Sequence, residues 1–303
     1  MKFALYEILF FLNMTKVALS PIIAGTMNWG VWDKKLTTSE MQNTIEVCLE
    51  SGIYSFDHAD IYGSYTTENE FGKAFNNCKI ERNQVQFISK CGIKSVSENR
   101  NYALKHYDYS KSHIIWSVEN SLKNLQTDYL DVLLLHRPSP LMQVDEIAEA
   151  IYQLKSEDKI LDFGVSNFTP SQTALLNQKI PVDFNQIQFS ATHFEPMLDG
   201  SLDFMQQHDI CPMAWNPLGS FFKSNDEKSI RIKNVVSVLA SKYDVEMDII
   251  LLSWILKHPA KVIPVVGTAS ISRIKNLNKA AAIHLETEEW FAIWTASLGK
   301  NIP

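Results

Sequence analysis

The sequence predicts an α/β fold of one domain, in which eight parallel strands close into a (β/α)8 TIM barrel. From residue 20 onward, short apolar runs alternate with amphipathic helical stretches eight times within the 303 residues. The strand candidates are apolar on both faces, as expected for parallel strands that are covered by helices. No linker and no break in composition divides the chain. These observations favour a closed barrel over an open sheet or two domains.

The first four strand–helix units occupy the N-terminal half of the chain. In each of them an apolar run ends on polar residues and an amphipathic stretch follows. The predicted strands are 21–27, 54–60, 85–93 and 129–138, and the helices predicted after them are 38–52, 67–75, 112–125 and 144–157.

The last four units repeat this pattern in the C-terminal half. Their strands are again short and apolar, which suits the buried wall of a barrel. The predicted strands are 160–168, 184–190, 211–219 and 261–267, and the helical stretches after them are 171–178, 201–208, the material across 229–257, and 272–282.

Capping motifs support the phase of three helices. Thr169-Pro170-Ser171-Gln172 combines an N-cap threonine, a proline at the first helical position and a glutamine that completes a capping box. The pairs Thr37 with Glu40 and Thr67 with Glu70 predict the same capping box.

Composition excludes several classes of function. The net charge of -6, with no block of basic residues, argues against a general nucleic-acid binder. The 4 cysteines are scattered and form no CxxC pair, so neither a zinc knuckle nor a redox dithiol is predicted. A reducing, cytoplasmic location fits this pattern best. We expect a monomer or a small homo-oligomer.

The N-terminal residues resemble a targeting segment without meeting its requirements. An apolar run follows Lys2, but Glu7 interrupts it and no small-residue cleavage site comes after it. The run is also too short to span a bilayer, so no membrane attachment is expected. We therefore interpret residues 1–13 as an extension and residues 14–303 as the barrel domain.

Polar side chains stand where the apolar strands end, which is where barrel enzymes place their catalytic groups. Asp57 and Lys90 follow apolar residues on neighbouring strands, and an ion pair between them would offset the cost of burying either charge. His136 ends the fourth strand, and Tyr62 lies one short turn beyond Asp57. An ammonium beside a phenol lowers its pKa and makes it a usable proton donor.

Each of these residues has a simpler explanation when it is taken alone. A lysine at a strand end is usually a snorkelling surface residue, a histidine after apolar residues is usually a hydrogen-bonded core residue, and Asp57 could cap a helix. Four complementary groups at three consecutive strand ends favour an active site instead.

Five motifs then identify a family resemblance that extends from about Ile22 to Asn276. In order and spacing they are similar to the signatures of the aldo-keto reductases. Some of their residues resemble those of a bacterial branch of largely uncharacterised short aldo-keto oxidoreductases. The motifs are FDHADIYG (56–63), ISKCGI (88–93), LLLHRP (133–138), GVSNFTP (164–170) and NQIQF (185–189).

The resemblance implies a mechanism in which hydride passes from NADPH to the carbonyl carbon of a small aldehyde or ketone. It makes Tyr62 the proton donor, Lys90 the residue that lowers the pKa of Tyr62, and Asp57 the partner of Lys90. His136 would orient the carbonyl group. Trp29 and Tyr107 are the residues that we expect at the substrate.

The resemblance also implies which residues bind the cofactor. Ser166, Asn167 and Gln186 would hydrogen-bond the nicotinamide carboxamide, and Trp215 would stack on the nicotinamide ring. Arg273 would face the 2′-phosphate; because a guanidinium clamps a phosphate well, we expect NADPH rather than NADH. The remaining predicted cofactor-binding residues are Gly25, Thr26 and Met27 beneath the ring, Asn216 beside Trp215, Leu218, Gly219 and Ser220 at the pyrophosphate, and Gly267, Thr268 and Asn276 at the adenosine.

Two other functions remain open at this level. A metal-dependent barrel hydrolase could use Asp57, His58, Asp60 and His136, although the chain lacks the HxH pair usual in such enzymes. A cofactor-sensing module would bind the nucleotide without turnover. The substrate is not identified, but aromatic residues of the loops 91–112 and 218–229 are expected to line its pocket, namely Tyr102, Tyr107, Tyr109, Phe221 and Phe222.

Overall fold

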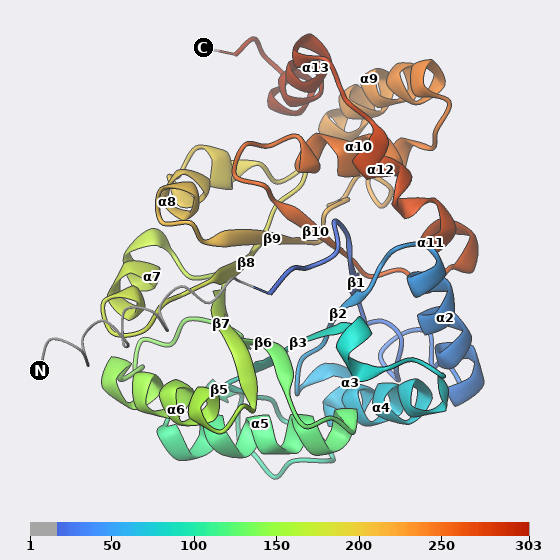
Figure 1. Ribbon diagram of the computed structural model, residues 1–303. Helices are drawn as coiled ribbons and strands as arrows, with labels where there is room; N and C mark the ends of the chain where they lie inside the picture. Colours follow the sequence, from blue (N-terminus) through green and yellow to red (C-terminus); the bar gives the residue numbers. More distant parts are fainter. Residues whose placement is uncertain (1–16, 303) are drawn as a thin grey trace, which may run out of the picture.

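The computed structural model of the protein describes residues 17–302. Eight parallel strands close into a barrel in the order β1-β10-β9-β8-β7-β6-β3-β2, and Figure 1 shows the helices arranged around them. The predicted (β/α)8 barrel is therefore confirmed. The predicted extension of residues 1–13, and a domain start at Met14, lie outside the described residues.

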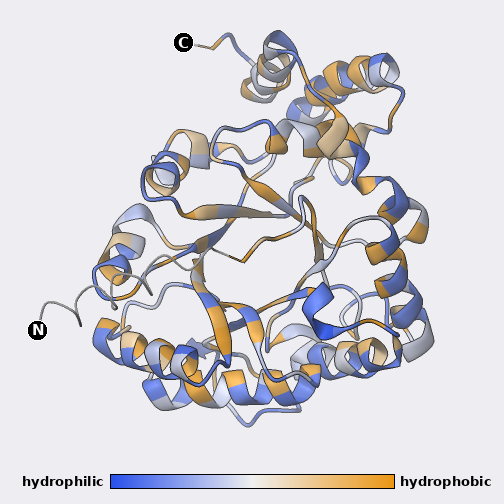
Figure 2. Ribbon diagram, in the orientation of Figure 1, coloured by the Kyte–Doolittle hydropathy of each residue, from blue (hydrophilic) through white to orange (hydrophobic). Residues whose placement is uncertain are grey.

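The barrel strands are short and almost entirely buried, in agreement with the apolar runs of the sequence. Figure 2 shows these apolar residues along the barrel wall. The strands are β1 (Ile23–Gly25), β2 (Ser55–Asp57), β3 (Gln86–Cys91), β6 (Leu130–Leu135), β7 (Ile160–Ser166), β8 (Phe184–Gln188), β9 (Cys211–Trp215) and β10 (Ile263–Val266).

The core has two parts. A large cluster fills the layer between strands and helices, where Trp29, Phe56 and Phe71 pack together. A smaller cluster consists of residues from the barrel strands, among them Ile88 and Phe184. Because both faces of the strands are covered, each strand needs a continuous apolar run rather than an alternating one.

The helices follow the strands in the predicted order. They are α2 (Thr38–Glu50), α4 (Thr67–Asn77), α5 (Lys111–Leu125), α6 (Val144–Ser156), α7 (Pro170–Asn177), α8 (Ser201–Gln207), α9 (Glu227–Tyr243), α10 (Met247–Leu256), α11 (Ile271–Leu277) and α12 (Lys279–Ala282). No helix in the described part of the chain combines the length and the apolar character needed to cross a membrane.

Two of the three predicted capping boxes are present. Thr37 caps α2 together with Glu40, and Thr169 caps α7 together with Gln172. The prediction for Thr67 and Glu70 was wrong. Thr67 is already the first residue of α4, because the short helix α3 (Tyr62–Tyr65) runs almost directly into α4 and leaves no extended residue for a cap.

A strand pair and a C-terminal helix come in addition to the eight units. Within 91–112, β4 (Ile93–Lys94) and β5 (His106–Tyr107) form an antiparallel pair beside the barrel mouth. After the eighth unit, α13 (Thr287–Leu298) packs near α9 and α10, as Figure 1 shows. There the indoles of Trp254 and Trp290 stack at 5.0 Å, and each donates a hydrogen bond to the backbone carbonyl of the other.

Candidate active site

Asp57 and Lys90 form a buried ion pair at the ends of the adjacent strands β2 and β3. Nζ of Lys90 lies 2.7 Å from both Oδ1 and Oδ2 of Asp57, and both side chains are almost completely buried. Nζ also donates to the backbone oxygen of His58 over 2.8 Å. Burial alone would lower the pKa of Lys90, but the combined effect of Asp57 and Tyr62 raises it, so the ammonium stays charged. The predicted ion pair is thus confirmed.

Tyr62 is brought onto this ion pair by a tight turn after β2. Nζ of Lys90 donates to the phenolic oxygen over 3.1 Å. The turn depends on Gly63, whose φ of 58° is unfavourable for other residues. A Cβ at Gly63 would also lie 2.3 Å from Oγ1 of Thr67. The position of Tyr62 is therefore fixed by the glycine that follows it.

The electrostatic environment of Tyr62 differs from the prediction in one respect. Burial raises its pKa, and this outweighs the opposing effect of Lys90, while Asp57 adds to the increase. The expectation that Lys90 brings the pKa of Tyr62 below its ordinary value was therefore wrong. The physical reason is that a phenolate in a closed pocket loses its hydration, and Asp57 cancels much of the field of Lys90.

His136 lies on the other side of Tyr62, directly after β6. The two rings meet edge to face with centroids 6.0 Å apart. Burial, with Lys90 and Arg137 nearby, holds the pKa of His136 well below its ordinary value, so the imidazole is neutral. Its Nδ1 is buried and has no hydrogen-bond partner within residues 17–302.

These groups open into a cavity of about 810 Å³ at the C-terminal end of the barrel. Tyr62, His136 and Asp57 form part of its wall, and the rest comes from strand ends and from the loops that follow them. The further lining residues that the sequence predicted are Gly25, Met27, Ser166, Asn167, Gln186, Trp215, Asn216, Leu218, Gly219, Gly267, Thr268 and Arg273.

Hydrogen bonds fix one side of this cavity. Nε1 of Trp215 donates to Oδ1 of Asn167 over 2.9 Å, and Nδ2 of Asn167 donates to Oγ of Ser166 over 2.7 Å. Asn167 and Asn216 both have a positive φ, which asparagine tolerates better than most residues. The indole of Trp215 is therefore held in one orientation beside a row of amide and hydroxyl groups.

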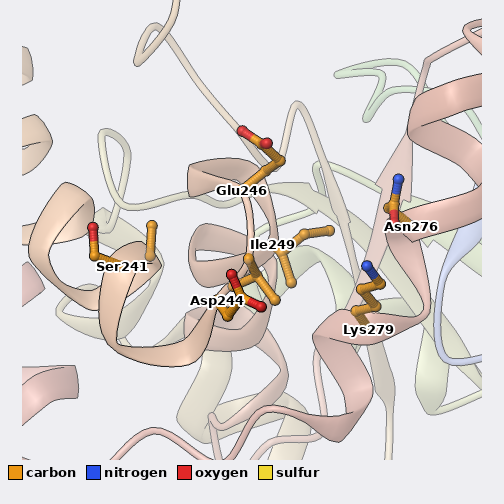
Figure 3. Close-up of a pocket in the computed structure, with 8 residues that line it drawn as sticks. Ser241, Asp244, Glu246, Ile249, Asn276 and Lys279 are labelled. Carbon is orange, nitrogen blue, oxygen red and sulfur yellow. The ribbon is translucent and has the colours of Figure 1, made fainter.

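Three predicted cofactor residues do not line this cavity. Thr26 is fully buried, and its Oγ1 lies 3.0 Å from the backbone oxygen of Asp57 and 2.9 Å from Nδ1 of His58. Ser220 is not part of the wall, although its neighbour Gly219 is. Asn276 lines a separate cavity of about 320 Å³, where it lies with Lys279 opposite Asp244 and Glu246, as Figure 3 shows.

The two predicted substrate contacts are corrected by the structure. Trp29 is fully buried between Phe56 and Phe71, and its Nε1 donates to the backbone oxygen of Thr268 over 3.1 Å. Tyr107 is in β5 and packs beneath the wall without lining it. Trp32, rather than Trp29, lines the cavity on this side, and its ring lies 6.0 Å from that of Tyr62.

Of the predicted loop aromatics, only Phe222 lines the cavity. Phe221 is fully buried, and the hydroxyl of Tyr109 is held by the backbone of Arg137. Tyr102 is also absent from the wall. Among the site residues that sequence reasoning missed are Trp32, Lys34, Lys105 and Lys223. The one signal that could have found them is their place in the loops after strands, which holds equally for many residues that stay outside the site.

The residues of the metal-hydrolase alternative do not form a metal site. Asp57 forms an ion pair with Lys90, and the ring of His58 packs against Phe71 and Phe87. Within the described part of the chain, no three histidine, cysteine, aspartate or glutamate side chains lie close enough to hold a metal ion.

Comparison with known proteins identifies the family. The model of the aldo/keto reductase family matches residues 21–297. The uncharacterized oxidoreductase YcsN of Bacillus subtilis is 41% identical over 290 residues, with 94% of this chain and 96% of that protein covered. A 6-dehydroglucose reductase of Agrobacterium fabrum is 34% identical over 293 residues, covering 95% and 97%.

A solved structure gives the same fold. The crystal structure of an aldo/keto reductase from Klebsiella pneumoniae in complex with NADP and acetate matches with a TM-score of 0.75 and 25% identity, covering 91% of each chain. Together with the barrel and the arrangement of Asp57, Tyr62, Lys90 and His136, these matches establish that the chain belongs to the aldo/keto reductase family of NAD(P)H-dependent oxidoreductases.

Proposed function

We propose that this protein uses NADPH to reduce the carbonyl group of a small aldehyde or ketone, with Tyr62 as the proton donor. The observation that supports this most strongly is the contact of 3.1 Å between Lys90 Nζ and the phenolic oxygen of Tyr62, on the wall of the cavity. A carbonyl oxygen bound between Tyr62 and His136 would meet a hydroxyl and a neutral imidazole.

The hydrogen-bond geometry directs the proton of Tyr62 toward the substrate. An ammonium group only donates, so Lys90 occupies a lone pair of the phenolic oxygen. The hydrogen of the hydroxyl group must then point away from Lys90. Since the raised pKa keeps Tyr62 protonated at neutral pH, the acid is in its working form before the substrate arrives.

Lys90 and Asp57 have a second task once the proton has left. The phenolate that remains on Tyr62 is stabilised by the ammonium at 3.1 Å, which is itself held by Asp57 and the carbonyl of His58. His136 stays neutral and lies beside the oxygen that receives the proton. Donors placed in advance in a water-poor site lower the barrier more than the same donors do in water.

The wall of the cavity fits a nicotinamide dinucleotide. Trp215 offers a fixed aromatic face, Asn167 and Gln186 offer amides, and Arg273 offers a planar cation for a phosphate. The Klebsiella pneumoniae relative was solved with NADP, which favours the phosphorylated form here. When bound, the reduced nicotinamide supplies the hydride. Thr26 would act from beneath, by holding the backbone of Asp57.

The cysteines of the protein indicate a reducing compartment. Cys48, Cys78 and Cys91 are buried free thiols. We therefore infer a cytoplasmic enzyme.

The experiment that tests the proposed function is a turnover assay with the purified protein. NADPH oxidation is followed with aldehydes, ketones and quinones, and 6-dehydroglucose is included because the Agrobacterium fabrum relative bears that name. NADPH consumption with formation of the matching alcohol is the expected result. Tight NADPH binding without turnover of any carbonyl compound would instead identify a cofactor-sensing protein.

A further inference from the structure

The charge of the cavity wall is opposite in sign to the charge of the chain. The protein carries a net charge of -6, yet the ionised side chains of the wall are almost all cationic. Asp57 is its one carboxylate among the described residues, and Lys90 neutralises that charge at 2.7 Å. The cations that line the cavity are Lys34, Lys105, Arg137, Lys223 and Arg273.

The cofactor does not account for all of these cations. Arg273 and Lys223 belong to the segments that follow β10 and β9, where the phosphates of a dinucleotide are expected. Arg137 instead follows His136 directly, and it lowers the pKa of both His136 and Tyr62. Lys105, from the loop between β4 and β5, also lowers the pKa of His136. These two cations therefore act on the catalytic end of the cavity.

The guanidinium of Arg137 is half-buried, and no acidic side chain within residues 17–302 pairs with it. In that range the guanidinium lies over the face of Trp215, 5.6 Å from the ring centroid. Two other partly buried cations of the protein are neutralised: Arg82 pairs with Asp131 at 2.7 Å, and Lys94 pairs with Asp108. Arg137 lies at the wall of the cavity without such a counter-charge in that range, so its guanidinium is available to an anionic ligand.

Lys105 and Lys34 are further cations of the cavity wall. Lys105 is exposed and makes no ion pair or hydrogen bond with the described residues. Lys34 lies 3.3 Å from Asp33, an exposed pair that leaves its ammonium accessible. The ring of Trp32 lies 6.0 Å from that of Tyr62 and gives the cavity wall an apolar surface there. The catalytic end thus offers one fork-shaped donor, additional positive charge and an aromatic face.

We propose that Arg137, assisted by Lys105, binds an anionic group of the substrate, so that the enzyme acts on small aldehydes or ketones that carry a carboxylate or a phosphate. This inference rests on the proposed reductase function of the same site. A guanidinium fits either anion with two parallel hydrogen bonds. The anion would then hold the carbonyl end of a short molecule against Tyr62 and His136.

Two matched pairs of substrates test the proposal. The first pair is para-carboxybenzaldehyde and para-formylbenzamide, which differ in charge but little in size. The second is glyceraldehyde with and without its phosphate. We expect kcat/KM to favour the anionic member of at least one pair by about ten- to one-hundred-fold, the range of one charge-assisted contact. The pair that shows the preference identifies the anion.

Variants connect this preference to the named residues. Arg137→Gln should bring the ratio of kcat/KM within the preferred pair close to one, and Lys105→Gln should lower it by less. Arg137→Lys keeps the charge but loses the fork, so it should retain an intermediate ratio. Lys111→Gln is the control, because Lys111 pairs with Glu149 outside the cavity. It should leave the ratio at the wild-type value.

The outcomes separate this proposal from the one on which it rests. Equal kcat/KM for charged and neutral members, with all of them reduced, would overturn the anion site and leave the reductase function intact. A preference that survives Arg137→Gln would also overturn the assignment. If the protein reduces none of the four compounds and no member of the wider panel, the reductase function itself is overturned.

Discussion

The side-chain amide of Gln186 donates a hydrogen bond of 2.8 Å to Oδ1 of Asp57, and so joins β8 to β2 across the mouth of the barrel. Its NH2 group must face Asp57, because a carboxylate only accepts. Gln186 also lines the cavity, where its other atoms can meet the nicotinamide carboxamide. One side chain therefore connects the expected cofactor position with the carboxylate that holds Lys90.

Gln186→Leu tests this connection. It keeps most of the side-chain volume and removes a hydrogen bond to a buried carboxylate, so we expect the free energy of unfolding to fall by about 1–3 kcal/mol. We also expect kcat/KM to fall by roughly tenfold, because one such hydrogen bond is lost from the site. Denaturant unfolding and steady-state kinetics measure the two effects. Gln188→Leu, on the same strand but outside the cavity wall, is the control.

Tyr62→Phe tests the proton donor. The substitution keeps the ring and removes the hydroxyl group, so folding and NADPH binding should be retained. The rate of carbonyl reduction should fall by about 10²–10⁴-fold, the usual contribution of general acid catalysis. Single-turnover kinetics with bound NADPH isolates this step. Tyr107→Phe, which changes a tyrosine outside the cavity wall, should keep the wild-type rate. A Tyr62→Phe enzyme as fast as wild type would contradict the mechanism.

Lys90→Met tests whether Tyr62 and Lys90 act as a unit. The rate should fall by an amount similar to that for Tyr62→Phe, because the phenolate loses the ammonium at 3.1 Å. This variant should also lose about 3 kcal/mol or more of stability, since Asp57 remains buried without its counter-charge. The double variant should be scarcely slower than either single one. Losses that multiply would mean that the two residues contribute independently.

The dependence of reduction on pH follows from the raised pKa of Tyr62. Reduction requires the protonated phenol, so the rate is retained below the pKa of Tyr62 and is lost as the pH rises through it. Since burial raises this pKa above the ordinary value of about 10, the rate should stay constant through neutral and moderately alkaline pH. Rates of the chemical step across this range check the direction. A decline that begins near neutral pH would show that Lys90 outweighs burial once the cofactor is bound.

Arg273→Ala tests the preference for NADPH. If Arg273 meets the 2′-phosphate, its loss should weaken NADPH binding by about 1.5–3 kcal/mol, the worth of a hydrogen bond to a charged group. NADH binding should change little. Titration calorimetry with both nucleotides measures the difference. Equal weakening of the two would show that Arg273 contacts a part that they share.

The order and type of the eight strand–helix units follow from the sequence by itself. Parallel strands covered on both faces need continuous apolar runs, and the helices between them need one apolar face, so both patterns are visible without coordinates. The ion pair of Asp57 and Lys90 was predictable for a related reason. Two charges at the ends of neighbouring apolar strands are too costly to bury separately, and the parallel topology brings their strand ends together.

The tertiary structure decided which side chains of the loops face the cavity. Trp29 and Trp32 are three residues apart in the sequence, yet one is buried against Phe56 and Phe71 and the other faces the cavity. Loop residues have no periodicity that fixes their direction, and the packing of distant elements chooses it. The same holds for Tyr107, which β5 turns away from the cavity.

The sign of the pKa shift at Tyr62 was also decided by the tertiary structure. The sequence indicated that Lys90 would stand beside the phenol, and it does. The balance between that ammonium, the nearby Asp57 and the loss of hydration depends on how closely the surrounding loops pack. Strand order predicts which residues become neighbours. How completely the surrounding loops exclude water from a site depends on the assembled barrel.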